Sequence, residues 1–324
     1  MRPDAARLMK FLLVWLALVP ASSPLMADDT PVPERMAVLV NDLGNDYFQV
    51  LSQSIRQTAL LRISPDIRVT VMSSGYDIER QRSQLNQWLE HEPTLIILTA
   101  ADPNAFIAEI STLQRLGHIV IAVDVEAVGA LITVTSDNWD AGYQSCLALA
   151  RALRANGKIA LLDGPPVSSI MERSDGCEDA LSYFPYIEIV DRENGGASFV
   201  GGIEAMSRLL SRNRELDGVF SINDPTALGA SAAAMMQGKS SLLIASIDGS
   251  PAVVEALRSG EPPLLTTAAQ FPRYMGERAV VLGWQAMREH RQDQQLHRMP
   301  VQMISSDNAS LFCQWQYCEV EGFD

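Results

Sequence analysis

The chain has 324 residues, a formal net charge of −14 at pH 7, and a composition of 47% hydrophobic and 20% charged residues. This composition is typical of a globular protein and excludes a disordered one. The length favours two lobes, because a single hydrophobic core rarely grows beyond roughly 250–300 residues. The acidic charge repels polyanions, so neither nucleic acid nor an anionic membrane surface is expected to bind this protein.

The first 27 residues are expected to be a cleaved signal peptide. Basic residues precede an apolar run at residues 11–19, and small and turn-forming residues follow it up to Ala27, which is the order found in secretory signals. The run is shorter than the roughly 20 residues that a membrane span needs. An uncleaved anchor is the alternative, and Ala21 is a second candidate for the cleavage position. The sequence therefore predicts export to the periplasm.

Four cysteines are present, and the two neighbouring pairs favour different interpretations. Cys313 and Cys318 enclose a short loop near the end of the chain, where a disulfide could hold the tail. Cys146 and Cys177 lie on apolar faces of predicted helices, where a cysteine is usually a small buried hydrophobe, and the sequence leaves open whether they pair. No metal site is expected, because neither a CxxC spacing nor a pair of histidines occurs.

Short β-branched runs alternate with segments of helical periodicity along the whole chain, which is typical of βαβ units with a parallel sheet. The strands expected in the first half are residues 36–41, 67–72, 94–98, 118–123 and 131–135, and the helices are residues 48–61, 78–89 and 105–116. The second half is expected to contain helices at residues 139–154, 170–183, 203–212, 226–236 and 252–259, with strands at residues 158–162, 187–190, 218–222 and 242–247. Gly157 is expected to end the first of these later helices.

Polar residues follow most of the expected strands. Ligands of open α/β sheets bind beyond the carboxyl ends of the strands, so a binding cleft is expected there. Each residue alone could be a helix cap or a turn residue, but their recurrence favours a cleft. The recurring residues are Asn41, Asp42, Asp124, Ser136 to Asn138, Asp163, Asn223, Asp224, Asp248 and Gln270.

Four short motifs, in this order and spacing, resemble the periplasmic ribose-binding protein family. They are Asn45-Asp46-Tyr47-Phe48, Ser136-Asp137-Asn138, the run SINDPTALGA from Ser221 to Ala230, and Ile247-Asp248-Gly249-Ser250. The resemblance extends from about Met36 to Gln302. It implies an α/β fold of the type I periplasmic binding protein class, in which two Rossmann-like lobes with parallel sheets are joined by a three-segment hinge.

The resemblance also implies where the lobes and the hinge lie in this chain. The N-lobe would comprise residues 34–136 plus 271–296, and the C-lobe would comprise residues 137–270 plus 297–324. The chain would then cross between the lobes near Ser136, near Gln270 and near Pro300.

Eight ligand-binding residues are implied by the same resemblance. The carboxylates among them would accept hydrogen bonds from a sugar, the arginine would donate, the amides would do both, and the aromatic rings would cover the C–H face of the sugar. Phe48 could instead be a core residue, Arg173 could be an exposed helix arginine, and Asp137 is expected to be a helix N-cap. The eight are Asn45, Tyr47, Phe48, Asp124, Arg173, Asn223, Asp248 and Gln270.

Two positions depart from the ribose-binding pattern. Val125 stands where that pattern has an arginine, and Ala197 stands where it has an aromatic residue. The loss of one donor group and one stacking face makes ribose itself an unexpected ligand. A larger sugar, a modified sugar or a non-sugar osmolyte could occupy the space.

The sequence therefore predicts a periplasmic protein that captures a sugar or similar small polar ligand and delivers it to the permease of an ABC-type importer. The alternative is a sensor subunit that docks on a membrane histidine kinase or another signalling receptor. The altered cleft and the cysteine-bounded aromatic tail at residues 311–317 motivate it. A transcriptional repressor is disfavoured by the signal peptide and by the lack of room for a DNA-binding domain before Met36. An enzyme is not expected, and neither is a cofactor, because no nucleophile elbow or phosphate loop is present.

Overall fold

The computed structural model describes residues 31–261, 263–312 and 315, and the chain from Pro31 onward forms one compact unit. The predicted signal peptide and the proposed disulfide between Cys313 and Cys318 lie outside the described residues. Among the helices that are described, none combines the length and the apolar character needed to cross a membrane.

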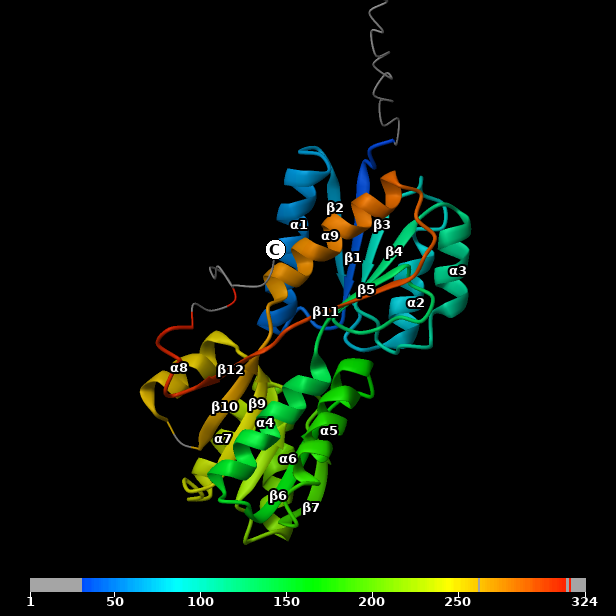
Figure 1. Cartoon of the computed structure of the whole chain (residues 1–324). Coiled ribbons are helices and arrows are strands. Elements are labelled where there is room, and N and C mark those ends of the chain that lie inside the picture. Colours follow the sequence, from blue (N-terminus) through cyan, green and yellow to red (C-terminus); the bar gives the residue numbers. More distant parts are fainter. Residues whose placement is uncertain (1–30, 262, 313–314, 316–324) are drawn as a thin grey trace, which may run out of the picture. The chain divides into compact units, whose positions relative to one another are not determined.

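Two six-stranded sheets form the framework of this unit (Figure 1). The first sheet has the order β11-β5-β4-β3-β1-β2 and is parallel throughout. Its strands are β1 (Arg35–Val40), β2 (Arg68–Ser73), β3 (Leu95–Leu98), β4 (Ile119–Val123), β5 (Ile132–Ser136) and β11 (Gln295–Met299). The second sheet has the order β12-β10-β9-β8-β6-β7, and only β12 runs antiparallel to its neighbour. Its strands are β6 (Asn156–Asp163), β7 (Tyr186–Asn194), β8 (Gly218–Ser221), β9 (Leu243–Asp248), β10 (Leu264–Ala269) and β12 (Gln302–Ser305).

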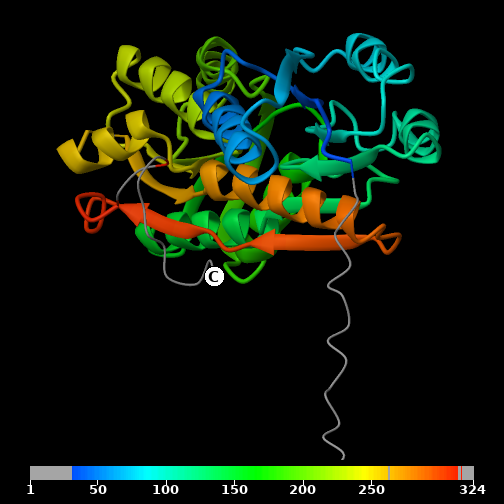
Figure 2. The ribbon, with the colours of Figure 1, turned by 90° about the horizontal axis from the view of Figure 1, so that it is seen from above.

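Helices cover both faces of each sheet. In the first sheet, α1 (Asp46–Arg62) and α9 (Pro272–Arg288) lie side by side on one face (Figures 1 and 2), while α2 (Ile78–Asn86) and α3 (Ile107–Arg115) pack with the other face. In the second sheet, α4 (Asn138–Ala152) and α5 (Ser168–Leu181) cover one face. The opposite face is covered by α6 (Phe199–Arg212) and α7 (Asp224–Met236), and α8 (Pro251–Ser259) packs on β10 and β12.

Alternating residues of the central strands explain why each sheet is buried on both faces. In β3, Leu95 and Ile97 belong to the core under α1 and α9, whereas Ile96 and Leu98 belong to the core under α2 and α3. Successive side chains of a strand point to opposite faces. A strand with helices on both sides is therefore apolar at every position.

The chain passes from one sheet to the other three times: after β5, after β10 and after β11. The first five strands of each half follow the doubly wound order 2-1-3-4-5, which creates a ligand site where the strand order reverses. These features confirm the predicted fold class of two α/β lobes joined by a three-segment hinge. The exact lobe boundaries given above stay a prediction.

The local predictions differ from the structure in several places, among them the following three. Gly157 does not end a helix: α4 ends at Ala152, and Gly157 lies within β6. Helix α6 begins at Phe199 rather than near residue 203, because Ser198 caps it through the amide of Gly201. The periodicity assigned no element after residue 259, whereas β10, α9, β11 and β12 lie there.

Helices α4 and α5 approach each other unusually closely, and glycine permits this. A Cβ atom at Gly142 would lie 1.9 Å from the carbonyl oxygen of Arg173, and one at Gly176 would lie 2.0 Å from the carbonyl oxygen of Trp139. Any larger residue at either position would force the two backbones apart. This contact fixes the part of α5 that carries Arg173.

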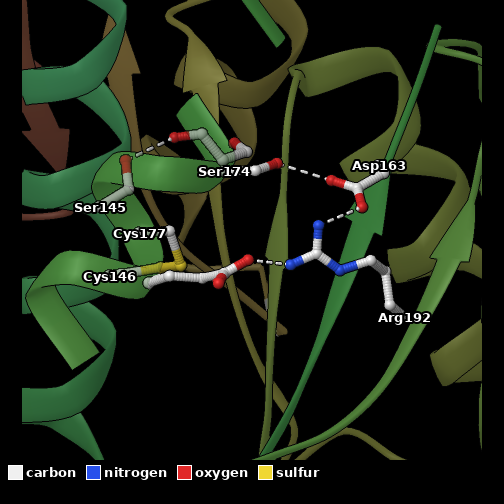
Figure 3. The surroundings of a disulfide bond; sticks show 8 residues. Ser145, Cys146, Asp163, Ser174, Cys177 and Arg192 are labelled. Carbon is white, nitrogen blue, oxygen red and sulfur yellow. Dashed lines mark hydrogen bonds and ion pairs between the residues drawn. A yellow bond between two sulfur atoms is a disulfide. The ribbon is translucent and has the colours of Figure 1, made fainter. Parts of the chain in front are cut away.

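A disulfide reinforces the same helix pair (Figure 3). Cys146 of α4 and Cys177 of α5 are fully buried, as expected of small hydrophobes, but they are also bonded to each other, with their Cα atoms 5.0 Å apart. The sequence had left this pairing open. Beside it, Ser174 and Arg192 donate to the two carboxylate oxygens of Asp163 at 2.6 and 2.8 Å, so α5 is also tied to the end of β6.

We expect the double variant Cys146→Ala/Cys177→Ala to lower the free energy of unfolding by roughly 2–4 kcal/mol, because the bond closes a loop of 31 residues in the unfolded chain. Equilibrium denaturation with guanidinium chloride measures this. Reductant should destabilise the wild-type protein by a similar amount and leave the double variant unchanged. Equal unfolding midpoints for the wild-type protein and the variant without reductant would contradict the assignment.

Candidate functional site

All eight residues predicted to bind ligand line one pocket. The pocket lies beyond the carboxyl ends of strands from both sheets, where the strand-order argument placed it. Asn45, Tyr47, Phe48 and Asp124 come from the first sheet and its connections, and Arg173, Asn223, Asp248 and Gln270 come from the second. Six further lining residues were not among the eight: Tyr76, Val125, Val167, Ser169, Ile170 and Ala197.

The first turn of α1 supplies one wall of the pocket. Asn45 caps this helix, and its side chain accepts a hydrogen bond from the amide of Tyr47 at 2.9 Å. Tyr47 and Phe48 are both buried and meet edge to face, with ring centroids 5.3 Å apart. Phe48 is therefore both a core residue and a lining residue, so the two interpretations offered for it are compatible.

Asp124 follows β4 and faces the pocket with its side chain almost fully buried. One carboxylate oxygen accepts a hydrogen bond from the Tyr47 hydroxyl at 2.9 Å. The backbone carbonyl of Asp124 accepts from Thr135 at 2.7 Å, which fixes the residue against β5. Burial is the main cause that raises the pKa of Asp124, and Arg173 and the Tyr47 hydroxyl oppose it.

Arg173 of α5 is buried, with 4% of its surface exposed, so it is not an exposed helix arginine. Its Nε donates to Asn138 at 2.9 Å, and Nη1 donates to the carbonyl of Ile222 at 2.9 Å. Nη1 also lies 3.5 Å from a carboxylate oxygen of Asp248. Asp137, which was expected to be an N-cap, does cap α4 by accepting from the amide of Asp140 at 3.1 Å.

Asp248 at the end of β9 is the most strongly perturbed acid of the pocket. Gln270 donates to it at 2.7 Å, and the indole of Trp315 donates to its backbone carbonyl at 2.9 Å. Burial raises the pKa of Asp248 to about 8, against the opposing effect of Arg173, and the carboxylates of Asp224 and Asp124 raise it further. Gln270 is itself 1% exposed, and its amide oxygen is buried without a hydrogen-bond donor.

Asn223 and Asp224 of the SINDPTALGA motif hold helix α7 against its neighbours at the carboxyl ends of the strands of the second sheet. Asn223 caps α7 by accepting from Thr226 at 3.1 Å, and it donates to the carbonyl of Ala197 at 3.2 Å. Asp224 is fully buried and accepts from Ser246, Thr267 and the amide of Ser250 at 2.5–2.8 Å. Asp224 thus ties α7 to two strands and α8, while Asn223 also lines the pocket.

Backbone conformation sets the pocket apart from the rest of the described chain. In the described chain as a whole, seven non-glycine residues have positive φ, and four of these seven line the pocket. Such conformations cost energy for residues with a side chain, and they cluster at binding and catalytic sites. The four are Tyr76 (φ 61°), Asp124 (67°), Ala197 (54°) and Asp248 (132°).

Tyr76 is the lining residue that the sequence analysis missed most clearly. It lies after β2, directly behind Gly75, which also has positive φ. Burial raises the pKa of the Tyr76 hydroxyl well above its usual range, and the carboxylates of Asp124, Asp42 and Asp248 add to this. No strand-end rule selects a residue three positions beyond a strand. The only available signal was a tyrosine beside a turn glycine.

The chemistry of the pocket is that of binding. Its polar groups are two carboxylates, one guanidinium and several amides and hydroxyls, set among apolar walls, which is the usual composition of a small-molecule site. Among the described residues, no group of three or more histidine, cysteine, aspartate or glutamate side chains is arranged to hold a metal ion. Fold and pocket together define a two-lobed α/β binding protein of the periplasmic type.

The family follows from comparison with known proteins. A model described as the periplasmic binding protein domain matches residues 36–291, and the chain belongs to that family. The ribose import binding protein of Bacillus subtilis is 25% identical over 244 residues, which is 74% of this chain and 77% of that protein. The D-apiose import binding protein of Actinobacillus succinogenes is 23% identical over 281 residues, which is 85% of this chain and 87% of that protein.

Solved structures show the same fold. A solute-binding protein of an ABC transporter from Bacillus halodurans, with bound myo-inositol, aligns with a TM-score of 0.79 at 22% identity, and covers 87% of this chain and 98% of that one. A periplasmic solute-binding protein from Actinobacillus succinogenes, with bound D-allose, has the same TM-score at 23% identity, and covers 86% of this chain and 100% of that one.

The raised pKa of Asp248 predicts how the stability of the ligand-free protein depends on pH. Between an unfolded pKa of about 3.9 and the folded value of about 8, the folded state keeps a proton that the unfolded state has lost. The free energy of unfolding should therefore fall as the pH rises from 5 to 8, by up to about 1.4 kcal/mol per pH unit from this group.

The variant Asp248→Asn should show a shallower fall over the same pH range, measured by urea denaturation at each pH. The control is Asp66→Asn, which replaces an exposed carboxylate in a loop and should follow the wild-type protein. Equal slopes for Asp248→Asn and the wild-type protein would show that Asp248 is ionised in the folded state throughout.

Proposed function

We propose that this protein captures a sugar or a related polyol between its two lobes in the periplasm and delivers it, without converting it, to the permease of an ABC-type importer. The observation that carries the proposal is the convergence of eight residues, from both sheets, on one pocket. Carboxylate, guanidinium and amide groups match the donors and acceptors of sugar hydroxyls. The relatives reported above are named for the import of ribose and D-apiose, which favours import over the sensor alternative.

Ligand capture is proposed to work through closure of the lobes. A ligand that contacts Asp124 on one lobe and Arg173 on the other interacts with both only when the lobes are close, so it stabilises that arrangement. A shift from 1:99 to 99:1 needs about 5.5 kcal/mol of differential binding. Two or three hydrogen bonds to charged groups, at about 1.5–3 kcal/mol each, are sufficient.

Hydrogen bonds near the hinge of the proposed lobes link Asp124 to Arg173. Asn138 accepts from Arg173 and donates to Thr135 at 3.1 Å, and Thr135 in turn donates to the backbone of Asp124. This chain of hydrogen bonds runs through the first passage between the sheets. The segment that connects the lobes therefore also connects the residues proposed to hold the ligand.

A thermal-shift screen of pentoses, hexoses and polyols, followed by calorimetry, tests the proposal. D-ribose, D-apiose, D-allose and myo-inositol belong in the panel. A ligand at 100 times its dissociation constant should add about 2.7 kcal/mol of stability. The proposal fails if no member of the panel shifts the unfolding temperature.

The variant Arg173→Ala should weaken binding of the best ligand by about 10- to 100-fold, because it removes a buried charged donor from the pocket. Arg212→Ala is the matched control: Arg212 forms surface ion pairs with Asp191 and Glu193, away from the pocket. Circular dichroism verifies that both variants are folded. Unchanged affinity in a folded Arg173→Ala protein would show that the ligand does not reach α5.

A further inference from the structure

The charges that line the pocket do not balance. Its charged residues are Asp124, Asp248 and Arg173, each no more than 5% exposed. Two carboxylates and one guanidinium leave a formal charge of −1 when all three are ionised. The ligand-free protein avoids this excess by keeping a proton on Asp248, whose pKa burial raises to about 8, and a ligand cation would replace that proton. A buried charge without a partner of opposite sign is strongly unfavourable.

Arg173 forms an ion pair with only one of the two acids. It lies 3.5 Å from Asp248, and its other recorded contacts are with neutral acceptors on Asn138 and Ile222. Asp124 receives a hydrogen bond from the neutral hydroxyl of Tyr47 and forms no ion pair. The neighbouring lining position, Val125, is apolar and adds no positive charge. Asp124 therefore faces the pocket without a direct ion pair, although the charge of Arg173 still lowers its pKa from a longer distance.

Several hydrogen-bond acceptors of the pocket also lack a donor. In the described part of the chain, the second carboxylate oxygens of Asp124 and Asp248 have no recorded donor, and the amide oxygen of Gln270 is buried without one. Asn223, in contrast, uses both ends of its side chain within the protein. A ligand that fills this pocket has to bring donors, and preferably a positive charge.

We infer that the ligand is a small hydroxylated amine, an amino sugar or an aminopolyol, whose ammonium group pairs with Asp124. This inference rests on the proposed function and specifies its substrate class. An ammonium group supplies three donors and no acceptor, and it cancels the excess charge. A neutral sugar supplies donors through its hydroxyls but leaves the charge. The net charge of −14 on the whole chain also attracts a cation toward the pocket.

Calorimetry with matched pairs of ligands tests the inference. The pairs are D-glucosamine with D-glucose, D-galactosamine with D-galactose, and D-mannosamine with D-mannose, at about pH 6.5, where an amine is protonated. The amine of at least one pair should bind at least tenfold more tightly than its neutral partner. The inference is overturned if every neutral sugar binds as tightly as its amine, or if only neutral sugars of the wider panel bind.

Variants at and beside Asp124 test whether this residue causes the preference for an amine over a neutral sugar. Asp124→Asn removes the charge at constant shape and should lower the ratio of amine to neutral affinity at least tenfold, and Val125→Arg should lower it as well by placing a cation beside Asp124. Glu126→Gln is the matched control, because Glu126 is an exposed carboxylate that does not line the pocket; its ratio should equal that of the wild-type protein. An unchanged ratio in a folded Asp124→Asn protein overturns the inference.

Different results would contradict sugar capture and the amine ligand. If neutral sugars bind and amines do not, the protein still captures sugars, and only the inference about the amine is wrong. If neither the neutral panel nor the amines bind, sugar capture itself is wrong.

Discussion

Burial of charge beside the pocket is the constraint on which the rest of the site depends. Asp124, Asp248 and Arg173 are almost inaccessible to solvent, and each would be strongly destabilising without a partner. The surrounding structure supplies those partners incompletely: Tyr47 for Asp124, Gln270 and Arg173 for Asp248, and the Asn138 side chain and the Ile222 carbonyl for Arg173. We propose that a ligand supplies the remaining compensation, which would couple its binding to closure of the lobes.

The fold positions these groups through features that look unfavourable in isolation. Asp124 and Asp248 adopt positive φ, and their backbone carbonyls accept hydrogen bonds from the side chains of Thr135 and Trp315. Arg173 reaches the pocket because Gly142 allows the backbone of α4 to touch that of α5, and the disulfide holds the pair together. The apolar cores on the faces of the two sheets offset the strain and the close approach at this edge.

The sequence predicted the sheets from repeating patterns, and it predicted the pocket from strand ends together with the resemblance to the ribose-binding family. Short apolar runs such as those of β3 and β4 favour buried strands, and polar residues at strand ends, such as Asp124 and Asp248, come together at one edge. Tyr76 escaped prediction because its place depends on a left-handed turn after Gly75 and not on a strand end. The pairing of Cys146 with Cys177 depends on how two helices cross, which their spacing in the sequence does not reveal.

Proton release during ligand binding tests the central claim most directly. Titration of the tightest ligand at pH 7, in buffers of different ionisation enthalpy, gives the number of protons exchanged after correction for the ionisation of the free ligand. The ligand-free protein holds a proton on Asp248 at this pH, and a ligand that brings donors and charge should displace it. We predict net release of up to about one proton per ligand. No release, or net uptake by the protein, would contradict the claim that the ligand completes the compensation of these buried charges.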